Sequence, residues 1–205
     1  INGIFLPEKD LKKIKFILGF IFSGCSHKLE VSDSYMEPHI NKKAQKVEDF
    51  ISSVSILENK SNILEKRSER LRAKGTLIKV DHGELNNTVS KSYFSQYFKN
   101  VSLTSSKINK DLYIESEILD SKFYFYAFPD GTHVEATLRI KAYYNGDLIL
   151  DKVYKNEKDI TVYLSAHLTL TSLFDETYHE AILNVYKNEF QKDLISVLKT
   201  KVAVN

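Results

Sequence analysis

The fold follows from the stretch Thr132-His-Val-Glu-Ala-Thr-Leu-Arg-Ile-Lys-Ala-Tyr-Tyr144, in which apolar and polar residues alternate. Side chains along a β-strand point to opposite faces in turn, so this alternation predicts a strand with one buried face and one wet face. An antiparallel sheet that is covered on a single side has this pattern. The buried side is expected to hold Val134, Ala136, Leu138, Ile140, Ala142 and Tyr144, and the wet side His133, Glu135, Thr137, Arg139, Lys141 and Tyr143.

Turn signals bound this stretch on both sides. Pro129-Asp130-Gly131 precedes it, with a glycine that can take a positive φ. Asn145-Gly146 follows it and favours a type I′ hairpin turn, which needs positive φ at both residues. With extended runs at Leu112–Phe128 and Leu148–Tyr154, the sequence predicts a three-stranded antiparallel meander.

Four other segments complete the predicted sheet and its connections. Strands are expected at residues 52–58 and at Gly75–Val80. A turn is expected at Asp81-His-Gly83. Ile160–Leu170 is rich in β-forming residues and is expected to be a further strand or a sheet edge.

Two helices are expected from apolar residues at helical spacing. The first covers Glu84–Asn100, with an aromatic face that fits the core better than a binding groove. The second covers Phe174–Lys199, with Thr171 or Ser172 as its N-cap. The sequence therefore predicts an α+β fold, with two helices packed on one face of a mainly antiparallel sheet of four to five strands.

The N-terminal part has the pattern of an export signal. The apolar run Phe16–Phe22 follows Lys9, Lys12, Lys13 and Lys15 and is too short to span a bilayer, which takes about 20 apolar residues. It ends in Phe22-Ser-Gly-Cys25, which resembles the bacterial lipobox. On that resemblance Cys25 becomes the mature N-terminus and carries a diacylglycerol and an N-acyl chain, and Ser26 in place of Asp points to the outer membrane. The alternative is that Cys25, the single cysteine, is a small buried residue on an N-terminal helix.

Length and charge fit one domain behind this signal. The expected division of the 205 residues is a signal peptide at 1–24, a lipidated N-terminus and tether at 25–45, and a single α+β periplasmic domain at 46–205. The net charge of +2 argues against a nucleic-acid binder.

A basic segment lies between two of the predicted strands. Lys60–Lys74 carries six basic residues against two glutamates. It is expected to be either a solvated loop or helix face, or a contact surface for anionic lipid, lipopolysaccharide phosphates or a partner protein. The residues that would make that contact are Lys66, Arg67, Arg70 and Arg72.

Aromatic residues give a second candidate contact. Phe123-Tyr-Phe-Tyr126 places aromatic side chains on both faces of its strand. Phe123, Phe125 and Tyr143 are expected either to pack in the core or to line a pocket for acyl chains.

The sequence contains no recognisable catalytic constellation or metal motif. His179-Glu180 does not complete the two-histidine zinc signature, because Leu183 stands where the second histidine would be. The six histidines are scattered along the chain. We therefore expect a protein that is not an enzyme and that holds no metal and no cofactor beyond the covalent lipid.

The order of elements behind the lipobox resembles small envelope lipoproteins. Two strands, an aromatic helix, a long meander and a C-terminal helix with Ala181 and Phe190-Gln-Lys-Asp-Leu194 are similar to the YajG and ABC-transport auxiliary (PqiC-like) lipoproteins, and to the lipopolysaccharide-assembly lipoprotein LptE. The resemblance covers about residues 50–200. It implies a periplasmic accessory or scaffold of an envelope protein complex that handles lipid or lipopolysaccharide. The alternative is a lipid or glycolipid carrier with an aromatic-lined pocket.

Overall fold

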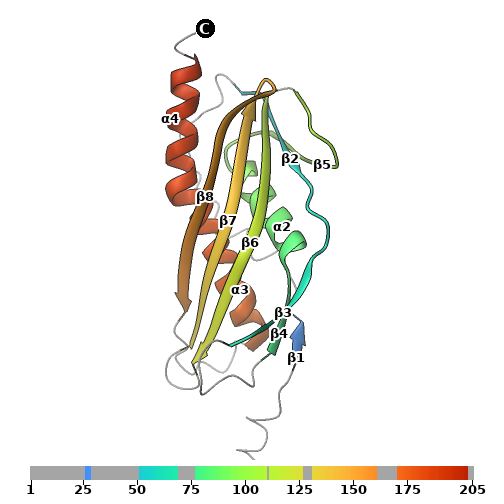
Figure 1. Ribbon diagram of the computed structural model, residues 1–205, viewed down its shortest axis with the longest axis vertical. Helices are drawn as coiled ribbons and strands as arrows, with labels where there is room; N and C mark the ends of the chain where they lie inside the picture. The colour runs from blue at the N-terminus through green and yellow to red at the C-terminus, as the bar shows by residue number, and fades with distance from the viewer. Residues whose placement is uncertain are drawn as a thin grey trace, which may run out of the picture.

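A computed structural model describes residues 26–28, 51–68, 77–109, 111–126, 131–160 and 170–202. Its core is a five-stranded sheet in the order β5-β2-β6-β7-β8, with a smaller sheet in the order β1-β4-β3 at one end (Figure 1). The strands are β1 (Ser26–Lys28), β2 (Ser53–Leu57), β3 (Ile63–Arg67), β4 (Leu77–Asp81), β5 (Asn100–Thr104), β6 (Leu112–Tyr126), β7 (Gly131–Tyr144) and β8 (Asp147–Ile160). The helical segments are α2 (His82–Ser95), α3 (Leu170–Val185), the π-helical turn η3 (Tyr186–Phe190) and α4 (Gln191–Val202).

The predicted α+β architecture is confirmed. β6, β7 and β8 form the antiparallel meander, while β2 pairs in parallel with both β5 and β6. Helices α2 and α3 lie together behind the sheet in Figure 1, and α4 continues beside β8. Among the described segments, no helix is long and apolar enough to cross a membrane.

The meander has the two faces that its sequence predicts. Leu138 and Ile140 are fully buried, while Arg139 between them is exposed. The hairpin after β7 is also as predicted, since Asn145 and Gly146 have φ values of 51° and 90°. A bulge between Ile118 and Asp120 shifts the register of β6, so that its buried residues change from even to odd numbers.

The small sheet corrects one prediction about the basic segment. The structure forms strand β3 at Ile63–Arg67, where a loop or helix face was one of the two expectations. β3 pairs with β4 in antiparallel register, and its long side chains keep their charged ends in solvent, so the charges do not prevent pairing. Three residues of the expected tether, Ser26–Lys28, form β1 and pair with β4 in parallel.

Helix α2 begins where a turn was predicted. Asp81 is its N-cap, and the Asp81 carboxylate accepts hydrogen bonds from the backbone N–H groups of Gly83 (3.0 Å) and Glu84 (3.1 Å). An aspartate before apolar residues at helical spacing is itself a signal for a helix N-terminus. Here this signal outweighs the turn that was predicted for Asp81-His-Gly83. The helix also ends at Ser95, earlier than predicted, and Asn100 opens β5, a strand that was missed.

The C-terminal helix is longer than expected. It already includes Leu170, so Thr171 and Ser172 lie inside the helix and are not its cap. The predicted strand or edge at 160–170 falls mostly outside the described residues. The π-helical turn adds a residue to the helical repeat at Tyr186–Phe190, and both of these end residues are buried.

Tyr186 contacts both helix α2 and strand β6. Its ring stacks on Tyr93 of α2 at a centroid distance of 5.2 Å and meets Phe190 edge-on at 5.7 Å. Its hydroxyl forms hydrogen bonds with Ser116 Oγ of β6 (2.6 Å) and Asn86 Oδ1 of α2 (3.1 Å). Three elements thus share one buried polar contact in which each partner is satisfied, as a dry core requires.

We expect Asp81→Ala to lower the free energy of unfolding at pH 7 by about 1–2 kcal/mol, since it removes the cap of α2. Burial alone would raise the pKa of the Asp81 carboxyl, but its four hydrogen-bond donors hold that pKa below the ordinary value. The carboxylate therefore stabilises the fold above the unfolded pKa of about 3.9, and this contribution is lost as the pH falls through the lower, folded value. Urea unfolding at pH 7 and pH 3 measures both effects. If the wild type and Asp81→Ala differed in free energy of unfolding by the same amount at the two pH values, the stabilising role of the Asp81 carboxylate would be contradicted.

Candidate functional site

A charged cleft opens where the small sheet meets the main sheet. Its volume is about 410 Å³. β2 pairs only with the first residues of β6, Leu112–Ile114, so the later part of β6 faces β3 instead. The lining residues are Glu65, Lys66 and Arg67 of β3, Leu77 of β4, and Asp120, Ser121, Lys122 and Phe123 of β6.

Two of the cations in the cleft form no ion pair with a described residue. Lys66 Nζ lies 3.2 Å from Asp120 Oδ1, so these two charges neutralise each other. The charge of Glu65 is met from outside the lining by Lys79, at 3.3 Å. Arg67 and Lys122 are exposed, and neither forms an ion pair with a residue that the structure describes. The cleft therefore presents an excess of positive charge.

One lining residue of the cleft, Ser121, belongs to a chain of buried polar side chains. His82 Nε2 lies 2.8 Å from Ser121 Oγ, which in turn lies 3.3 Å from the hydroxyl of Tyr178. Burial lowers the pKa of His82 to about 4, and the charge of Lys66 acts in the same direction. His82 is therefore neutral near pH 7. The other ring nitrogen, His82 Nδ1, has no hydrogen-bond partner among the described residues.

The structure brings together three of the predicted site residues. Lys66, Arg67 and Phe123 all line the cleft, although the ring of Phe123 is buried against Phe174 at 5.3 Å. Arg70, Arg72 and Cys25 lie outside the described residues.

The other two predicted aromatic residues lie elsewhere. Phe125 packs edge-on against Phe174 at 5.9 Å, in the core. Tyr143 is on the opposite face of the sheet, with its ring 5.7 Å from that of Tyr113 and 3.7 Å from Lys107 Nζ. Phe123 pairs with Val134, nine positions along β7 from Tyr143, which is about 30 Å of strand. These aromatic residues therefore do not meet in one pocket.

Sequence reasoning identified three of the eight described residues that line the cleft and missed the other five. Asp120, Ser121 and Lys122 are ordinary positions in a long strand, and only the bulge and the early end of β2 turn them toward β3. His82 was assigned to a turn. The aspartate before it was the one available signal, because it marks the helix start that places His82 against β6.

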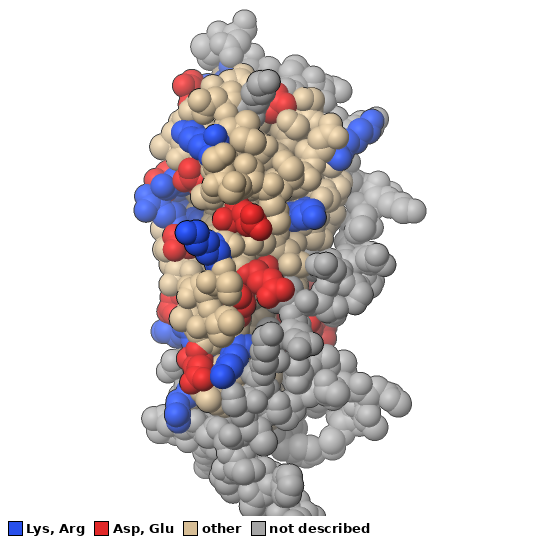
Figure 2. Space-filling view, turned by 90° about the vertical axis from the view of Figure 1, so that its right-hand side faces the viewer, with Lys and Arg blue, Asp and Glu red and all other residues tan. Residues whose placement is uncertain are grey.

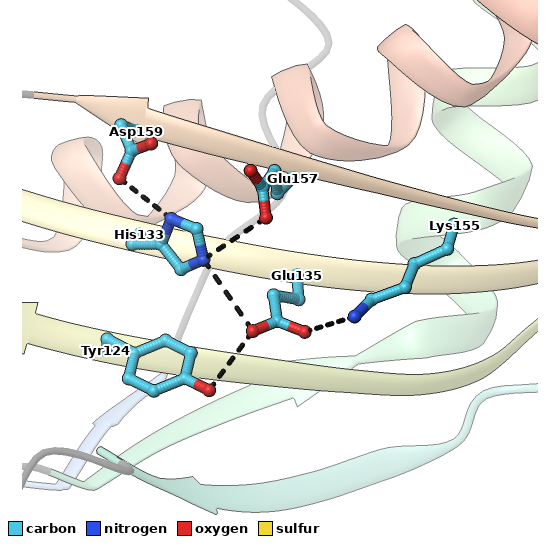
Figure 3. Close-up of polar contacts among 6 residues, drawn as sticks. All are labelled: Tyr124, His133, Glu135, Lys155, Glu157 and Asp159. Carbon is cyan, nitrogen blue, oxygen red and sulfur yellow. Dashed lines mark hydrogen bonds and ion pairs between the residues drawn. The ribbon is translucent and has the colours of Figure 1, made fainter.

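A second polar cluster covers the outer face of the meander. Figure 3 shows six side chains from β6, β7 and β8, with His133 and Glu135 at the centre. His133 Nδ1 lies 2.7 Å from Asp159 Oδ1, and His133 Nε2 lies 4.0 Å from Glu157 Oε2. Glu135 accepts from Lys155 (2.7 Å) and from the Tyr124 hydroxyl (3.1 Å), and the hydrogen bond from Lys155 is the main reason that the pKa of Glu135 is lowered.

Cross-strand ion pairs continue along this outer face. Arg139 donates two hydrogen bonds to Asp151, at 2.9 and 2.8 Å, and Lys141 lies 3.5 Å from Glu115. Within the described ranges no group of three or more histidine, cysteine, aspartate or glutamate residues is arranged to hold a metal ion. Opposite charges on this face therefore pair across the strands.

Comparisons with known proteins add similarity of shape only. No protein-family model matches the sequence, and no curated protein matches it. A Xanthomonas campestris protein of the DUF330 family has a TM-score of 0.47 at 10% identity, over 88% of this chain and 98% of that one. A hypothetical protein of Chlamydia trachomatis has a TM-score of 0.36 at 12% identity, over 71% of this chain and 95% of that one.

A third similar structure comes from Helicobacter pylori and is named as a homolog of a neuraminyllactose-binding hemagglutinin. Its TM-score is 0.37 at 11% identity, over 80% of this chain and 98% of that one. At these identities and TM-scores the three matches carry no argument about what this chain binds.

The buried His82 should make stability depend on pH between about 6.5 and 4. The unfolded chain binds a proton at His82 near the ordinary pKa of 6.5, whereas the folded protein does so only near 4. The free energy of unfolding should therefore fall as the pH drops through this window, by up to roughly 3 kcal/mol from this one residue. Urea titrations of the wild type and of His82→Gln should show a shallower fall for the variant. Equal slopes would refute the buried, neutral state of His82.

Proposed function

We propose that this protein is a lipid-anchored protein of the bacterial outer membrane, with its folded body in the periplasm. In this proposal it serves as a non-catalytic accessory or scaffold of an envelope assembly or of a lipid or lipopolysaccharide transport machine. The lysines and the apolar run before Phe22-Ser-Gly-Cys25 support the anchor. The open edge of β5 is the observation that supports a scaffold.

Among the described strands, β5 is the last on its side of the main sheet and pairs only with β2. The carbonyl oxygen of Thr104 accepts from the N–H of Glu58 (2.8 Å), on the β2 side. Backbone polar groups point to the two sides of a strand in turn, so Val101 and Leu103 present theirs to the open side. Such an edge is a template for pairing with an extended segment of another chain.

The two edges of the main sheet differ in their protection. β8 has seven charged residues among its fourteen, whereas β5 has the sequence Asn-Val-Ser-Leu-Thr, with no charge and no proline. Charged residues and proline are the usual means of keeping other strands away from an edge. Figure 2 views the side on which β5 lies in Figure 1, and uncharged residues cover most of the described surface in the upper half of that view.

The alternative of a lipid or glycolipid carrier needs an apolar pocket. Phe123 and Phe125 are the aromatic residues that would line it, and both pack against Phe174. We therefore prefer the scaffold. The cleft itself is too polar for acyl chains, since Leu77 and Phe123 are the only apolar side chains among its described lining residues.

Cys25→Ser should abolish acylation. In a bacterium that processes lipoproteins, the wild-type chain should incorporate labelled palmitate and sediment with the membrane fraction. The variant should remain unlabelled, because it lacks the only thiol in the chain. A wild-type chain that stays unlabelled, or whose mature form begins before Cys25, would overturn the anchor.

A photo-crosslinking amino acid at position 102 should capture a specific partner in intact cells, and the same probe at the exposed Ser196 of α4 should not. Ser102→Lys should weaken recovery of that partner in affinity purification at least tenfold, because a lysine at a strand edge opposes pairing. Ser196→Lys is the matched control and should have no effect. Equal capture at both positions, or a partner that Ser102→Lys leaves in place, would refute docking at β5.

A further inference from the structure

We propose that the cleft between β3 and β6 binds the phosphate-bearing headgroup of an anionic phospholipid, with Arg67 and Lys122 as the binding cations. This rests on the proposed anchor only in so far as the anchor brings headgroups within reach. Three independent features of the cleft point to this ligand class: its charge, its size and lining, and its place in the fold.

The charge of the cleft is arranged to select an anion. Lys66 is paired with Asp120 and Glu65 with Lys79, whereas Arg67 and Lys122 form no ion pair within 4.0 Å with a described residue, although the charge of Lys122 helps to lower the pKa of Glu135. A guanidinium donates two parallel hydrogen bonds to a phosphate, and an ammonium adds a point charge. Lys122 lies opposite Glu135 in the strand register, but Glu135 is already bonded to Lys155 at 2.7 Å.

Size and lining fit a headgroup and not an acyl chain. The cleft of about 410 Å³ falls within the range of small-molecule sites, roughly 300–1,000 Å³. Of the eight described residues that line it, five are charged, so the described part of its surface is mostly polar. Buried hydrocarbon would gain little there.

The strand register places the cleft near Ser26, the residue that follows Cys25 in the chain. Ser26, which directly follows Cys25 in the chain, pairs with Leu77 of β4, and Leu77 pairs with Arg67 of β3. Arg67 is therefore two strands away from Ser26, a distance of about 10 Å. Acyl chains on Cys25 would thus hold Arg67 close to the headgroup layer. The C-terminal end of α4 lies at the opposite end of the molecule (Figure 1).

The test is a titration of the full chain carrying Cys25→Ser, kept in a non-ionic detergent and followed by amide NMR shifts. The probes are glycerophosphoglycerol, which is an anionic headgroup without acyl chains, glycerophosphocholine, which has the same phosphodiester with a compensating cation, and inorganic phosphate. We expect glycerophosphoglycerol to bind most tightly and to shift residues of β3 and β6. Arg67→Gln with Lys122→Gln should weaken it about tenfold or more, the usual effect of losing a charged hydrogen bond.

Two further variants exclude a general effect of charge or of unfolding. Lys91→Gln with Lys192→Gln removes the same charge from exposed helix positions and should leave the affinity unchanged. Asp120→Asn frees Lys66 from its ion pair and should tighten binding several-fold, a change that damage to the fold cannot produce. Unaltered thermal unfolding of each variant accompanies the titrations.

Each other outcome would count against the proposal. Equal affinity for glycerophosphocholine would show that anionic charge is not recognised. Inorganic phosphate bound as tightly as glycerophosphoglycerol would indicate a free-phosphate site and overturn headgroup recognition. Absent binding, or binding that ignores Arg67 and Lys122, would refute the site. The Cys25→Ser chain cannot be acylated, so the titration gives the same information whether or not the wild-type chain incorporates palmitate. The two proposals can therefore fail separately.

Discussion

One face of the β6–β7–β8 meander has to be buried while the other has to stay in water, and the rest of the structure depends on this constraint. Leu138 and Ile140 have no exposed surface, whereas Arg139 between them pairs with Asp151 across the strands. Only one side of the sheet can therefore accept a covering layer. Helix α3 packs on β7 and β8, and α2 packs on β2, β5 and β6, so the two helices share that side. The outer face stays in contact with water, and its charged side chains form ion pairs across the strands.

The cleft is a by-product of unequal strand lengths. β6 has 15 residues, but β2 has 5 and pairs with only the first part of β6. The remaining edge of β6 would be open without β3, which approaches it through the ion pair of Lys66 with Asp120 and through the hydrogen bond from the N–H of Phe125 to Ser68 Oγ. Because the two strands meet through side chains and not through a backbone ladder, space remains between them. Charged side chains border that space.

The molecule has distinct ends. The small sheet and the cleft are at the end where β1 lies, while the hairpin at Asn145-Gly146 and the C-terminal end of α4 lie toward the other (Figure 1). The uncharged edge of β5 belongs to this second region. A lipid anchor before β1 would hold the cleft at the membrane and leave β5 facing the periplasm. In the proposed arrangement, one end would recognise lipid and the other a protein partner.

The sequence by itself determined the elements whose signals are local. The alternation of Thr132–Tyr144 fixed the strand and its buried face, and Asn145-Gly146 fixed the hairpin, because strand pleat and turn φ values depend on neighbouring residues alone. Tertiary structure decided where β3 and β5 pair, since a strand of five residues is stable only through the partner that it finds. It also decided that Lys66 forms an ion pair with Asp120, while Arg67 forms none with a described residue. Charges that lie 54 positions apart, as Lys66 and Asp120 do, meet only after the sheets have assembled.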